Sequence, residues 1–106
     1  MQALEALADP TRRRIVELLT DGERSAGALA AEFSVSRPAV SRHLRVLRET
    51  GLVQAREEGT SRVYSLDPAP LQELDDWLER YRGLWAQRLD ALETQLRRAR
   101  RGEETR

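Results

Sequence analysis

The chain has 106 residues, enough for one domain with a modest core, and its 18 cationic residues balance its 18 acidic ones. It has no cysteine, which excludes disulfides and thiolate metal sites, and with no apolar run of membrane-spanning length and no signal peptide we expect a cytoplasmic protein. The charge is segregated: every cation is arginine, residues 36–66 hold six arginines and three glutamates, and residues 67–96 hold seven acids and three arginines.

Two helices are predicted at the N-terminal end, over residues 2–8 and residues 9–20. Asp9 suits an N-cap and Pro10 the first helical position, and the inward-facing positions are Ile15, Leu18 and Leu19. The arginines at 12–14 lie where the helix macrodipole disfavours cations. Either a phosphate or a carboxylate compensates them, or they form a solvated basic turn.

A helix-turn-helix is predicted over about residues 25–50. A short helix of small residues, 25–33, is separated by a tight turn from a second helix that ends near Gly51. Ser25 and Ser36 are the expected N-caps. The apolar stripe of the second helix consists of Val40, Leu44 and Leu47.

The second helix of this motif is the candidate recognition helix for the major groove of DNA. Arg42 and Arg45 lie opposite the apolar stripe and are expected to reach base edges or flanking phosphates, although arginines on a solvated helix face are the alternative. Arg48 suits a phosphate contact or a salt bridge near Glu49 equally well. The candidate DNA contacts of this helix are Ser36, Arg37, Pro38, Ser41, Arg42, Arg45 and Arg48.

His43, the one histidine, borders the apolar side of the recognition helix. A packed, hydrogen-bonded structural histidine is favoured over a metal ligand or a pH switch, because one histidine alone makes no metal site.

A β-hairpin is predicted over residues 52–66, with its turn at 57–60. A hairpin directly after a recognition helix is the wing of a winged helix. Its candidate DNA contacts are Arg56, Thr60, Ser61 and Arg62, and a plain exposed hairpin is the alternative. Glu57 and Glu58 would repel phosphate and are expected to point away.

A last helix is predicted over about residues 68–101, with apolar residues at steps of three and four, close to a coiled-coil seam. The small domain before it cannot cover so long a stripe, so we expect a twofold dimer. The stripe positions assigned to the interface are Leu71, Leu74, Leu78, Tyr81, Trp85, Leu89 and Leu92. Residues 97–106 form a basic tail that is expected to fray.

Aromatic residues at 77, 81 and 85 of the last helix favour a dimer core, with a pocket for a small effector as the alternative. The acidic cluster of Asp75, Asp76 and Glu79 favours a solvated face over a cation site. The predicted fold is therefore mainly α with a small β-hairpin, a winged helix-turn-helix dimer domain over residues 1–96.

Four segments together resemble the ArsR/SmtB winged-helix regulators, over about residues 3–96. They are ALADPTRRRIVELL at 6–19, VSRPAVSRHLRVL at 35–47, ETGLV at 49–53 and GTSRVYSL at 59–66. The resemblance implies a homodimer with the first and last helices at its interface, which adds Leu4 and Leu7 to the interface positions. It also implies repression at an inverted-repeat DNA operator, usually at the protein's own promoter.

The chain departs from the metal-sensing members of that family. Where they carry a cysteine pair, residues 29–33 read LAAEF, and where others place aspartate and histidine on the last helix, this chain has Asp75 and Asp76 but no histidine. It resembles the cysteine-free branch, so we expect no metal and no cofactor. No catalytic set of residues is apparent, so an enzyme is disfavoured. The alternatives are a winged-helix protein-interaction module and a small-molecule-responsive regulator.

Overall fold

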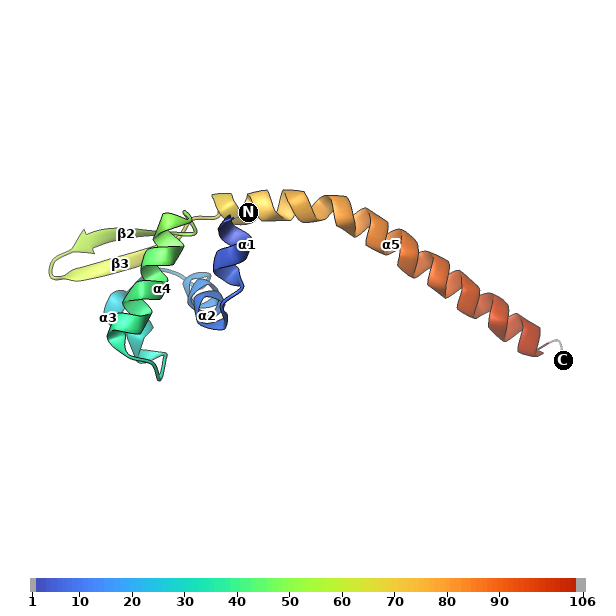
Figure 1. Ribbon diagram of the computed structural model, residues 1–106, viewed down its shortest axis with the longest axis horizontal. Coiled ribbons are helices and arrows are strands. Elements are labelled where there is room, and N and C mark those ends of the chain that lie inside the picture. Colours follow the sequence, from blue (N-terminus) through green and yellow to red (C-terminus); the bar gives the residue numbers. More distant parts are fainter. Residues whose placement is uncertain (1, 105–106) are drawn as a thin grey trace. The chain divides into compact units, whose positions relative to one another are not determined.

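The computed structural model describes residues 2–104 and is mainly α, with one small antiparallel sheet and a long C-terminal helix, as predicted (Figure 1). The element order is α1 (Gln2–Leu7), α2 (Pro10–Leu19), β1 (Arg24–Ser25), α3 (Ala26–Ala31), α4 (Arg37–Glu49), β2 (Val53–Glu58), β3 (Ser61–Leu66) and α5 (Ala69–Glu104).

Contacts within the chain divide it into two compact units, residues 1–74 and residues 75–106. The first unit holds α1 to α4, the sheet and the start of α5, and the second holds the rest of α5. The sequence instead predicts a boundary after residue 96, at the end of a winged helix-turn-helix dimer domain. That division stays a prediction.

Side-chain caps begin the helices of the first unit where the sequence predicted them. Asp9 accepts hydrogen bonds from the amides of Thr11 (2.8 Å) and Arg12 (3.1 Å) at the start of α2. The Ser25 hydroxyl accepts from Ala28 N (3.1 Å), and the Ser36 hydroxyl accepts from Ala39 N (3.3 Å). Gly51, with φ of +79°, follows the C-cap of α4 and adopts the left-handed conformation that ends helices.

The core of the first unit lies between the helices and the sheet. The predicted inward residues of α2 and the apolar stripe of α4 are all buried. The largest fully buried side chains are Ile15, Leu29, Val40, Leu44, Leu47 and Leu52. Each buried aliphatic side chain of this size contributes roughly 1.5–3 kcal/mol by leaving water. This packing fixes which face of α4 remains exposed.

The sheet has three antiparallel strands in the order β1-β3-β2. The predicted hairpin is present, with Val53 opposite Leu66 at its base and Glu58 opposite Ser61 at its tip. The turn contains Gly59, whose φ is +61°. The strand β1, which pairs with Val63 and Tyr64 of β3, is an addition to the two predicted strands. Its two residues are too few to show any alternation of polar and apolar side chains.

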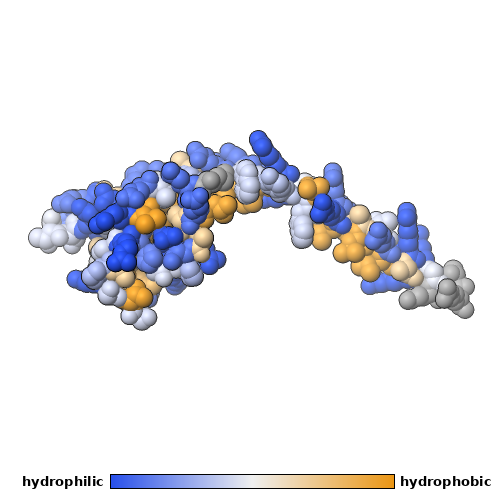
Figure 2. Space-filling model, viewed as in Figure 1, coloured by the Kyte–Doolittle hydropathy of each residue, from blue (hydrophilic) through white to orange (hydrophobic). Residues whose placement is uncertain are grey.

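The second unit is a single helix whose apolar side chains are exposed in one chain. Trp85 is 64% exposed and Leu96 is 54% exposed. Figure 2 shows apolar side chains gathered along α5. The Trp77 and Tyr81 rings lie 5.0 Å apart, centroid to centroid. Among residues 2–104, no helix combines the length and the apolar character needed to cross a membrane.

Candidate nucleic-acid interface

The exposed side of α4 carries the arginines that the sequence assigned to DNA. With Val40, Leu44 and Leu47 buried on one side, the four arginines of the helix are exposed: Arg37, Arg42, Arg45 and Arg48. None of them forms an ion pair with another residue of the described part of the chain. In particular, Arg48 forms no salt bridge with Glu49 in the part of the chain that the structure describes, so its cation is available to an anionic partner.

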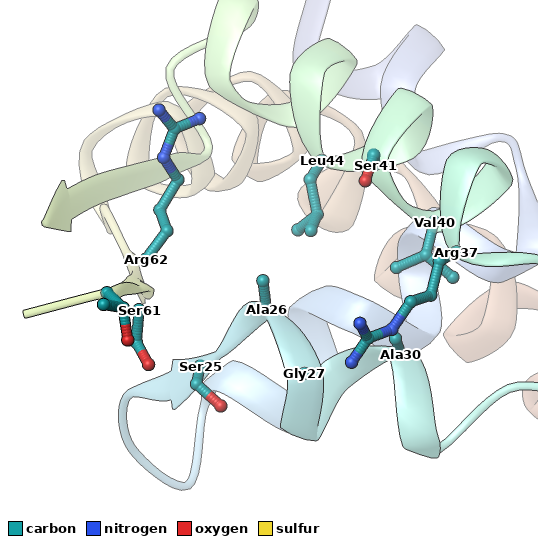
Figure 3. A pocket seen from close by; sticks show the side chains of 11 residues that line it. Ser25, Ala26, Gly27, Ala30, Arg37, Val40, Ser41, Leu44, Ser61 and Arg62 are labelled. Atoms are coloured by element: carbon teal, nitrogen blue, oxygen red, sulfur yellow. The ribbon is translucent and has the colours of Figure 1, made fainter.

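A groove of about 420 Å³ lies between α3, α4 and the wing, which is the β2–β3 hairpin. Ala26, Ala30, Val40 and Leu44 give it an apolar part, and hydroxyl and guanidinium groups complete its lining (Figure 3). In Figure 3, Arg37 reaches from α4 towards Ala30, and Arg62 lies on the other side of the groove. The predicted contacts that the groove brings together are Arg37, Ser41, Thr60, Ser61 and Arg62.

Gly27 of α3 lies beside the Arg37 side chain. A Cβ atom added at Gly27 would lie 3.4 Å from Arg37 Nη2, an ordinary van der Waals contact. No spacing in the sequence predicts this proximity, because the glycine stands in a short run of small residues.

The remaining predicted contacts lie outside this groove. Arg45 and Arg48 line a separate, open depression of about 580 Å³ beside β2. Arg42 lines neither hollow, and Ser36 is engaged as the cap of α4. The structure therefore divides the predicted contacts: five line the groove, Arg45 and Arg48 line a neighbouring depression, and Arg42 lies in neither.

The two arginines of the wing differ from those of α4, because carboxylates hold them. Arg56 pairs with Glu23 and, at 2.9 Å, with Glu58. Arg62 pairs with Glu57 at 3.3 Å. The hydrogen bond to Glu23 is the main reason why the pKa of Arg56 is raised.

Glu57 and Glu58, which the sequence analysis expected to point away, are thus the partners of the wing arginines. The pairing of Glu23 with Arg56 could not be predicted from local spacing, because Glu23 lies 33 positions before Arg56 in sequence.

His43 occupies the other flank of α4 and is half-buried, as expected of a structural histidine. Its Nδ1 atom lies 3.5 Å from Arg12 Nη1 and 4.0 Å from Asp9 Oδ1. The backbone amide of Arg12 is the largest cause of the lowered pKa of Asp9, and the charge of His43 acts in the same direction. Within residues 2–104, no three acidic or histidine side chains are grouped as a metal site.

The arginines at the start of α2 turn out to have local partners in two cases. Arg12 donates through Nε to the Ala6 carbonyl (2.7 Å), and Arg14 pairs with Glu17 (3.4 Å). A backbone carbonyl and a carboxylate are therefore the local partners of these two cations.

The predicted interface residues are spread over both units. In the first unit Leu4 is exposed, and the half-buried ones are Leu7, Leu71 and Leu74. In the second unit the exposed ones are Leu78, Tyr81, Trp85, Leu89 and Leu92. A mainly apolar groove of about 360 Å³ follows part of this face, lined by Leu78, Tyr81, Arg82, Leu84, Trp85 and Arg88.

The known proteins to which this chain is similar agree with one another in their descriptions. Residues 9–55 match the family described as bacterial regulatory protein, arsR family. The chain is 52% identical over 80 residues to the HTH-type transcriptional regulator Rv2034 of Mycobacterium tuberculosis, covering 76% of this chain and 75% of that protein. It is 36% identical over 74 residues to the transcriptional repressor SdpR of Bacillus subtilis, covering 70% of this chain and 82% of that protein.

A solved structure agrees with these sequence relatives. The crystal structure of a possible transcriptional regulator for arsenical resistance is 49% identical to this chain, with a TM-score of 0.71. The likeness covers 76% of this chain and 84% of that one.

Proposed function

The chain belongs to the ArsR family of bacterial transcriptional regulators, a family of DNA-binding proteins and not of enzymes, and from this premise we propose that it is a homodimeric repressor. The two α4 helices of the dimer would enter successive major grooves of an inverted-repeat operator, about 34 Å apart. The operator would lie in the promoter of the protein's own gene, so that the bound protein blocks transcription of that gene.

The observation that carries the proposal is the unpaired state of the α4 arginines. Arginine binds guanine edges and phosphates through a planar fork of donors, which a carboxylate partner would otherwise occupy. The wing arginines are already occupied by Glu23, Glu57 and Glu58. We therefore assign sequence reading to α4 and a weaker backbone contact to the wing.

Support for a dimer comes from the exposed apolar face of α5. Soluble proteins seldom leave large apolar side chains in a continuous row open to water. The steps of three and four between these residues suit packing against a second helix of the same kind. A second copy of the chain would also cover the groove around Tyr81 and Trp85, which otherwise suits a small apolar effector.

Fluorescence anisotropy of the full chain with DNA from upstream of its own gene tests the proposal. Titrations across a salt series, with a random-sequence duplex as competitor, should show binding that is tight, steeply salt-dependent and resistant to the competitor. The stoichiometry should be two chains per site. Equal and weak affinity for both duplexes would contradict autoregulation and favour the protein-interaction alternative.

A further inference from the structure

A polar cluster joins α1 and α2 to the recognition helix, on the flank of α4 away from the groove. We call the Ala6 carbonyl, Asp9, Arg12 and His43 the α1–α4 bracket. At its centre, the half-buried Arg12 guanidinium donates through Nε to the Ala6 carbonyl (2.7 Å) and directs Nη1 to His43 Nδ1 (3.5 Å). One side chain thus contacts the end of α1 and the middle of α4.

The bracket also sets the surroundings of the His43 ring nitrogen Nδ1. Arginine can only donate, so a hydrogen bond from Arg12 needs this nitrogen as its acceptor. Asp9 faces the same nitrogen at 4.0 Å, but its Oδ1 is engaged by the amides of Thr11 and Arg12. The groups around the ring therefore hold one orientation of His43.

His43 lies directly between the exposed residues that are proposed to read DNA. Arg42 precedes it, and Arg45 follows two positions later. A rotation of α4 about its axis would move His43 away from Arg12 and turn both arginines with it. Base-edge hydrogen bonds tolerate little displacement, so the orientation of α4 matters more for specific than for non-specific binding.

We propose that Arg12 and His43 are positioning residues for DNA recognition. The bracket holds α4 in the orientation that reads the operator and ties that orientation to α1. This inference rests on the proposed function, because it presumes that α4 reads DNA. It assigns neither residue a contact with DNA.

Two isosteric substitutions separate positioning from direct contact. In His43→Asn the amide oxygen takes the place of Nδ1 and still accepts from Arg12, whereas in His43→Gln the amide group reaches the position of Nε2 and leaves Arg12 without its acceptor. Arg12→Lys keeps the cation but cannot make both contacts with a single ammonium group. Arg13→Lys, at an exposed neighbour, is the matched control.

The readout is the ratio of dissociation constants for two duplexes, measured by anisotropy. One is the duplex that the wild-type chain enriches from a random pool, and the other is an unselected duplex. His43→Gln and Arg12→Lys should each lower this specificity ratio about tenfold, the effect of one lost hydrogen bond to a charged group. The double variant should lose little more, because the two residues act as one unit. His43→Asn and Arg13→Lys should stay near the wild-type ratio.

The alternatives give different patterns. If His43 touches DNA through Nε2, His43→Gln keeps the ratio and His43→Asn loses it, which overturns the proposal. If the bracket only stabilises the fold, the unfolding midpoint falls and the ratio does not change, which also overturns it. A wild-type chain that enriches no duplex contradicts the proposed function itself, and that result is separate from either pattern.

Discussion

At the scale of single residues, the arginines of the first unit differ in their surroundings. Those of α4 face solvent without a carboxylate partner, those of the wing are paired, and Arg12 is half-buried between α1 and α4. Exposed ion pairs contribute little to stability, so a phosphate can displace a wing carboxylate at low cost. The same residue type therefore occurs in three settings within one small unit: without a carboxylate partner on α4, paired in the wing, and half-buried in the α1–α4 bracket.

Asp9 gives a pH-dependent prediction at this scale. Its pKa lies below the ordinary value of 3.8, chiefly because the Arg12 amide donates to it. The stability it contributes is therefore fully present above pH 3.8 and is lost as the pH falls through the lowered folded-state value.

At neutral pH, Asp9→Asn should lower the free energy of unfolding by about 0.3–1 kcal/mol, because the amide still caps α2 but lacks the charge. Urea unfolding, followed by circular dichroism at several pH values, measures this difference. The free energies of unfolding of the wild-type chain and Asp9→Asn should become more similar as the pH falls into the acid range. A difference that is the same at every pH would exclude the carboxylate charge as its cause.

Glu57 is predicted to weaken DNA binding by occupying Arg62. Glu57→Gln removes a negative charge and leaves Arg62 without its carboxylate partner, so affinity for any duplex should rise a few-fold and its salt dependence should steepen. Anisotropy with an unselected duplex measures both. Glu93→Gln is the matched control, since it frees Arg97 in the second unit by the same chemical change. Equal affinities for the two variants would refute this role for Glu57.

Elements defined by local signals were predictable from the sequence, and those defined by distant contacts were not. The caps Asp9, Ser25 and Ser36 and the buried stripe of α4 follow from residues within one or two turns. The strand β1 exists only because Val63 and Tyr64 lie beside it, about 40 positions later. The Glu23–Arg56 pair and the α1–α4 bracket likewise depend on the tertiary fold, to which no local spacing points.

Gly83 lies within α5, where the helical backbone does not require a glycine. No atom lies within 4 Å of a Cβ added at Gly83. On a helical wheel this position lies away from Trp85 and Leu89. Gly83→Ala should therefore stabilise the helix by about 1 kcal/mol, seen as a higher midpoint of unfolding by circular dichroism. A lower midpoint would mean that a second chain approaches α5 at this position.

The whole molecule is proposed to be a dimer because α5 is long and apolar on one side. Its 36 residues extend about 54 Å. The large apolar residues of α5 that lie in the second unit are exposed in a single chain. A helix with such a row of leucines and aromatic residues is more stable against a partner than in water. Two recognition helices on one symmetric particle would then match a symmetric operator.

Leu89→Glu should separate the two chains. An unpaired buried charge in a helix interface costs about 3 kcal/mol or more, which weakens association at least about a hundredfold. Sedimentation velocity should show a monomer at concentrations where the wild-type chain is a dimer. Gln87→Glu places the same charge on the opposite side of α5 and should leave the dimer intact. Monomers from both variants, or dimers from both, would place the interface elsewhere.

The DNA affinity of the Arg42→Ala/Arg45→Ala variant tests the central claim, that α4 reads the operator. We expect anisotropy titrations on the duplex selected by the wild-type chain to show specific binding abolished while the dimer stays folded. The salt slope should fall by about one for each lost phosphate contact. Arg80→Ala removes a single arginine from α5 and should retain wild-type affinity. Wild-type affinity in the double variant would contradict the assignment of α4 as the recognition helix.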